Sequence, residues 1–251
     1  MNRQILTPAQ LIDIREKLNR ANENILNLNS EINTFLNGRP DSTTSNENTN
    51  AVQELFEFWA NRKIPPRFSV ITGEVVHHLR SCLDHIAWML SSDAYRLSNE
   101  RQIAFPIVTK RKPWDKDTIT SYGRQVKGIT DSNALSLIDQ LQPCHAAEPA
   151  DDPLTIVHEL NRIDKHHNLV LVITGFNMRM TFPVTAPIVI HAHDNVEINR
   201  AIIAEKANFQ ISPYIAFGQF GKREKQPVVE SLTHLLDAVS SRVNLFAGDY
   251  R

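Results

Sequence analysis

The feature that most constrains this chain is a long heptad pattern near its amino terminus. Eight apolar residues follow one another at alternating steps of three and four: Leu11, Ile14, Leu18, Ala21, Ile25, Leu28, Ile32 and Phe35. Thr7, Pro8 and Gln10 are typical of a helix start, with an N-cap, a first-turn proline and a residue that completes a capping box. Gly38 and Pro40 end the pattern. We expect a helix of about 30 residues, whose seam packs on another helix in the same chain or in a second copy.

The rest of the chain predicts more helices and one β-rich region. Further helices are expected over 67–91, 114–126, 131–141, 153–166 and 227–247. About five antiparallel strands are expected from runs of β-branched and alternating apolar residues, near 169–174, 178–184, 188–193, 196–204 and 209–217. Residues 41–50 contain no apolar side chain and predict a mobile loop.

These elements predict an α+β fold, mainly a helical bundle with an antiparallel β-sheet inserted before the C-terminal helix. We expect a single domain over 1–251, made of a helical core (1–167), a β-sheet region (168–226) and a closing helix (227–247).

Bulk composition narrows the class of protein. The 27 basic and 28 acidic residues give a net charge of −1, so a polyanion must be held by a local patch rather than by the field of the whole molecule. Two cysteines are too few for a disulfide framework. No signal peptide and no membrane-spanning run is evident. We expect a cytoplasmic protein with no membrane partner.

The predicted helix over 67–91 carries an unusual polar face. Seven polar residues lie opposite its apolar arc: Glu74, His77, His78, Arg80, Ser81, Asp84 and His85. Surface helices usually display Lys and Glu, whereas this one offers three His, an Arg and an Asp. The composition of this face indicates a functional surface.

The spacing Arg80-x4-His85 within an amphipathic helix resembles the Arg-x4-6-His signature of the HEPN superfamily. The segment Leu79–His85, followed by Leu160–His166, is also similar to a set of uncharacterised bacterial proteins with Leu-Arg-Ser-x-Leu-Asp-His and Asn-x-x-Asp-Lys-His helices. The superfamily resemblance implies a metal-independent endoribonuclease that acts as a homodimer without a cofactor. It also implies toxin or phage-defence roles, RNA as substrate and an antitoxin or other protein partner.

In that interpretation Arg80 and His85 are catalytic. His85 moves the proton of a ribose 2′-hydroxyl, and Arg80 holds the phosphate. The two residues lie about 140° apart around one helix, so a second helix or a second copy must complete the site. The alternative is structural: Arg80 forms an ordinary ion pair with Asp84, and His85 is an interface histidine.

Seven further residues are candidate supporting groups: His77, His78, Asp84, Asn161, Asp164, Lys165 and His166. Lys165 offers charge to a phosphate and Asn161 an orienting amide, although the same spacing is typical of a solvated helix face. Asp164 lies near the apolar edge, where it caps amides or pairs with a basic group.

Three functions follow from these residues. The first is a HEPN-like endoribonuclease, and the second is a catalytically inactive HEPN-like module that binds RNA, a nucleotide or a protein. The third is a metal-dependent hydrolase, because His191 and His193 would share one face of a strand. No metal is expected under the first two.

Overall fold

The computed structural model describes residues 4–37, 43–44, 58–59, 61–110, 121–181, 188–192, 208–218 and 225–248. The chain forms two compact units. Unit 1 comprises Met1–Ile25, Ile71–Asn168 and Leu232–Arg251. Unit 2 comprises Leu26–Val70 and Leu169–Ser231.

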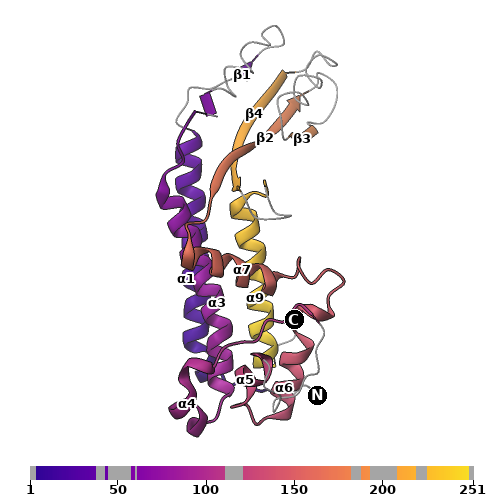
Figure 1. Ribbon diagram of the computed structural model, residues 1–251. Coiled ribbons are helices and arrows are strands. Elements are labelled where there is room, and N and C mark those ends of the chain that lie inside the picture. The colour runs from indigo at the N-terminus through magenta and orange to yellow at the C-terminus, as the bar shows by residue number, and fades with distance from the viewer. Residues whose placement is uncertain are drawn as a thin grey trace. The chain divides into compact units, whose positions relative to one another are not determined.

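Three long helices contribute to unit 1: α1 (Pro8–Leu36), α3 (Pro66–Leu90) and α9 (Val228–Ala247). The fourth main helix, α7 (Pro153–His166), crosses them (Figure 1). Shorter elements lie between α3 and α7: α4 (Asp93–Asn99), α5 (Ser121–Val126), α6 (Ser132–Gln140) and the 3-10 turns Glu100–Gln102 and Pro143–His145. The helix α4 was not predicted from the sequence, which indicated a connection after Ser92.

The predicted heptad seam packs within the chain. Its residues are buried except Leu18 and Phe35, which are half-buried. The Cys82 thiol donates to the Ile14 carbonyl over 3.5 Å, and the Asn24 amide donates to Glu74 over 3.2 Å. Because positions rise along α1 while they fall along α3, the two helices are antiparallel, side by side in Figure 1.

The helix starts follow the predicted chemistry. The Thr7 amide donates to Gln10 Oε1 over 2.9 Å, and the Gln10 amide donates to Thr7 Oγ1 over 3.3 Å, which is the expected capping box. At α7, Asp152 accepts from the Leu154 amide over 2.8 Å. The other oxygen of Asp152 accepts from Arg242 over 3.2 Å, so the same carboxylate joins α7 to α9.

Unit 2 contains an antiparallel sheet with strand order β1-β4-β2-β3. Its strands are β1 (Thr43–Thr44), β2 (Leu171–Thr181), β3 (Ile188–Ala192) and β4 (Asn208–Phe217). Figure 1 shows β2 and β4 as the long central pair. The predicted fold class is confirmed: the protein is α+β and mainly helical, with its sheet before the C-terminal helix.

The sheet differs from the prediction in two places. The strands expected at 169–174 and 178–184 are one continuous strand, β2, with a register irregularity between Ile173 and Gly175. Gly175 therefore marks a bulge rather than a turn. Thr43 and Thr44, inside the expected mobile loop, pair with Gln210 and Phe209. The expected strand at 196–204 and residues 114–120 of the expected helix lie outside the described residues.

Unit 2 combines residues 26–70 with the β region, because α1 and α3 each contribute residues to both units. Among the helices of the described ranges, none is long and apolar enough to cross a membrane.

Candidate functional site

Arg80 is buried and already engaged. Only 7% of the residue is exposed. Its Nη2 lies 2.6 Å from Asp84 Oδ1 and its Nε lies 3.2 Å from Asp84 Oδ2, which is a two-point ion pair one turn along α3. The structural alternative for this pair, an Arg–Asp contact at i and i+4, is present in the fold.

The same pair forms hydrogen bonds with the backbone of Phe105. Arg80 Nη2 donates to the Phe105 carbonyl over 2.8 Å, and the Phe105 amide donates to Asp84 Oδ1 over 2.9 Å. Pro106 favours an extended conformation at Phe105, in which the N–H and C=O of one residue point to the same side. The fully buried Phe105 ring packs edge-on against Phe246 of α9, with ring centroids 6.5 Å apart. We call Arg80, Asp84, Phe105 and Phe246 the Arg80 clamp.

Arg80 also faces α7. Burial lowers the pKa of His158, and the charge of Arg80 lowers it further. Arg80 Nη1 is a buried atom with no hydrogen-bond partner among the described residues, as is Oδ1 of Asn161 on α7. His158 of α7 is therefore an imidazole near Arg80 that comes from a second helix. The sequence analysis expected a second helix or a second copy to complete the site, but it did not name His158.

Gly73 explains how α7 approaches α3 so closely. A Cβ at position 73 would overlap the carboxylate of Asp164. Burial raises the pKa of Asp164, while the nearby His77 lowers it. Asp164 is thus packed against the helix backbone at a glycine.

His78 and His85 of α3 lie near α1. Burial lowers the pKa of both His78 and His85, and the ammonium of Lys17 on α1 is the next cause for each. His77 and Arg20 lower the pKa of His78 further, and the two imidazole rings of His77 and His78 lie 6.3 Å apart. We call Lys17 and Arg20, together with the neighbouring rings of His77, His78 and His85, the α1–α3 cationic cluster, in which the lysine and the arginine carry the charge.

The predicted site is therefore split between two sides of α3. Arg80 and Asp84 belong to the clamp and approach α7, whereas His85 and His78 approach α1. Asn161 is buried, while Lys165 and His166 are exposed at the end of α7. Lys17 was missed, although it occupies a position flanking the heptad seam, where side chains contact the partner helix.

A metal centre gains no support in the described part of the chain. No group of three or more His, Cys, Asp or Glu side chains gathers there. His191 lies in β3, but its side chain is outside what the structure describes, and His193 is outside the described residues altogether. The thiol of Cys82 is buried, and burial raises its pKa to about 12, so it is not a thiolate ligand at neutral pH.

Comparison of this chain with models of known protein families, with curated proteins and with solved structures gives no match.

The clamp predicts a large stability loss when only its carboxylate is removed. Asp84→Asn leaves a buried guanidinium without its counter-charge. We expect a loss of about 2–3 kcal/mol in the free energy of unfolding, below that of a fully buried pair because Asp84 is partly exposed. Urea denaturation measures it. The matched control is Glu23→Gln, whose exposed pair with Arg20 should contribute less than about 1 kcal/mol. Equal losses in the two variants would show that the clamp is not structural.

The three lowered histidine pKa values predict acid sensitivity. Below about pH 6.5, His78, His85 and His158 bind protons more readily in the unfolded chain than in the folded protein. The free energy of unfolding therefore decreases as the pH is lowered. Asp164 acts with the opposite sign, at the more acidic pH where carboxyl groups titrate. We expect the Tm to fall between about pH 7.5 and about pH 5.5, and to fall less in His158→Gln. Leu97→Gln, at an exposed residue, should keep the wild-type slope, and an unchanged slope in His158→Gln would contradict the assignment.

Proposed function

We propose that this protein is a HEPN-like, catalytically inactive module that binds RNA through its phosphates, at the α1–α3 cationic cluster. The observation that carries the proposal is the commitment of Arg80 to the clamp. Three of its contacts are taken by Asp84 and the Phe105 carbonyl, and the side chain is 9% exposed. A guanidinium held in this way does not grip a phosphate during catalysis.

The cluster supports binding because the ammonium of Lys17 lies near two imidazole rings two turns apart on one face of α3, His78 and His85. The lowered pKa values keep both rings neutral near pH 7, so Lys17 supplies the charge and the rings supply hydrogen-bond donors. The nearby carboxylates are Glu74, which accepts a hydrogen bond from Asn24, and Asp13 and Asp84, which act on His85, while Arg20 is paired with Glu23. A lysine attracts a phosphate through a local contact, which requires no net positive charge on the chain. RNA, rather than another polyanion, is proposed from the resemblance of the Arg80-x4-His85 helix.

We expect Lys17→Ala to weaken binding of single-stranded RNA about three- to tenfold, because one phosphate contact is lost. The slope of log affinity against log salt should fall by about 0.7, the value for one contact to a single strand. Fluorescence anisotropy measures both. Lys127→Ala, at an exposed lysine of unit 1, is the matched control and should bind as the wild type does. Equal affinity of the Lys17 and Lys127 variants would remove the cluster as the binding site.

A second candidate function, metal-independent RNA cleavage, is favoured by one observation. Arg80 and His158 bring a guanidinium and an imidazole together from two helices, and Arg80 Nη1 keeps one donor without a partner among the described residues. The low pKa of His158 keeps its ring neutral near pH 7, as a general base requires. In this candidate, His158 or His85 takes the proton of the 2′-hydroxyl.

An RNA-cleavage assay in the presence of a chelator separates the two functions. The inactive module predicts no turnover by the wild type. Cleavage that is lost in His158→Ala but retained in His85→Ala would assign the reaction to the α7 side of α3, and the reverse result would assign it to the predicted pair Arg80 and His85. Folding of each variant is checked by circular dichroism, because Arg80 and its neighbours also hold the bundle together.

A further inference from the structure

Unit 2 contains an aromatic cluster that the proposed function does not use. Four rings meet there, from Phe35 on α1, Phe58, Trp59 and Phe68 on α3. The centroids of Phe58 and Trp59 are 5.0 Å apart, and Phe35 packs edge-on with Phe68 at 5.7 Å. Trp59 and Phe68 are buried, whereas 38% of Phe58 is exposed. Part of an aromatic surface therefore reaches solvent.

Arg62 lies over this cluster. Its guanidinium carbon is 4.3 Å from the Phe35 ring centroid, 5.0 Å from that of Trp59 and 5.6 Å from that of Phe58. Among the residues that the structure describes, no carboxylate forms an ion pair with Arg62. Within the described part of the chain, the contacts of the Arg62 guanidinium are with ring faces, which leave its charge uncompensated there.

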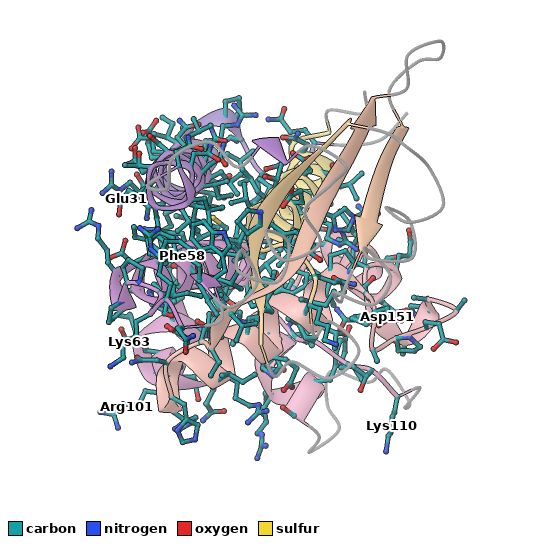
Figure 2. The ribbon with its side chains drawn as sticks, turned by 90° about the horizontal axis from the view of Figure 1, so that it is seen from above. Glu31, Phe58, Lys63, Arg101, Lys110 and Asp151 are labelled. Atoms are coloured by element: carbon teal, nitrogen blue, oxygen red, sulfur yellow. The ribbon has the colours of Figure 1, made fainter. Side chains whose placement is uncertain are left out.

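Two further basic residues lie beside the cluster in the sequence, Lys63 and Arg67. Lys63 follows Arg62 and is exposed, and Figure 2 shows it at the outer edge of the side chains. Arg67 is different, because both oxygens of Glu31, also marked in Figure 2, lie 2.9 Å from its Nε. One partly exposed ring, one guanidinium over ring faces and one exposed lysine thus lie within six residues of the chain.

We propose that Phe58 and Arg62 form a stacking site for an unpaired base of single-stranded RNA, with Lys63 on the adjacent phosphate. Proteins that bind single strands combine aromatic faces with neighbouring cations, because every base has a π-face and every linkage a charge. The site lies within unit 2, and it deepens the proposed function by naming single-stranded rather than duplex RNA as its substrate class. In a duplex the base faces are already stacked.

The test compares two probes of equal length: a short oligoadenylate, and the same oligonucleotide with abasic riboses. Both carry the same phosphates, so their difference reports stacking alone. We expect the wild type to bind the oligoadenylate about tenfold more tightly than the abasic strand. Phe58→Leu should abolish that difference while leaving abasic binding unchanged, and Phe58→Tyr should restore it. Arg62→Lys, which keeps the charge and loses the planar group, should reduce it.

The outcomes separate this proposal from the proposed function. Equal binding of the two probes by the wild type, or an undiminished difference in Phe58→Leu, would overturn the stacking site and show that the cluster only packs unit 2. Loss of abasic binding in Lys17→Ala would still support the cationic cluster in that case. Unchanged abasic binding in Lys17→Ala, together with a difference that disappears in Phe58→Leu, would support stacking and remove the cluster. If Phe58→Leu melts below the wild type, Lys63→Gln provides a surface variant, expected to weaken both probes equally.

Discussion

The contact between the Arg80–Asp84 pair and the backbone of Phe105 is the constraint on which the rest of unit 1 depends. A buried guanidinium is costly unless its charge and its donors are matched, and here a carboxylate one turn away supplies most of the match. The carbonyl of Phe105 supplies another contact, so the segment between α4 and α5 is tied to α3 by its main chain. The ring of Phe105 packs against Phe246 of α9. The hydrogen bonds to the Phe105 backbone therefore also position this apolar contact.

This arrangement changes the meaning of the polar face of α3. A helix with three His, an Arg and an Asp suggested a single functional surface, but the structure divides these groups. The Arg is buried and the Asp partly buried, and His158 of α7 lies within electrostatic reach of both. The imidazoles of His78 and His85 turn to α1, where Lys17 joins them. One helix thus carries a buried ion pair on one side and two neutral imidazoles beside a lysine on the other.

Gly73 shows how closely the crossing of α7 over α3 is set. The Asp164 carboxylate occupies the space of the missing side chain, so the two helices approach to a distance that no larger residue permits. Asp164 becomes partly desolvated as a consequence, which is why its pKa rises. The sequence motif that contains Asp164 and Lys165 is therefore divided in the same way as the motif on α3, into one packed residue and one exposed residue.

Local patterns in the sequence were sufficient for the long helices and the fold class. The heptad seam specified α1, and the Thr7–Gln10 box specified its start. These features depend on neighbours a few residues away, and the sequence displays such neighbours directly. The single strand β2 was predicted as two because a glycine at a bulge and a glycine at a turn look alike without the partner strand.

What only the tertiary structure decided is the role of each polar residue. The sequence placed Arg80 and His85 on one helix but did not determine which helix each would face, since that depends on where α1, α7 and the Phe105 segment pack. Charge pairing acts through space, over distances that sequence separation does not encode. The sequence by itself therefore determined which residues have suitable chemistry, and the packing of helices distant in the chain determined which of them are buried in pairs and which are exposed.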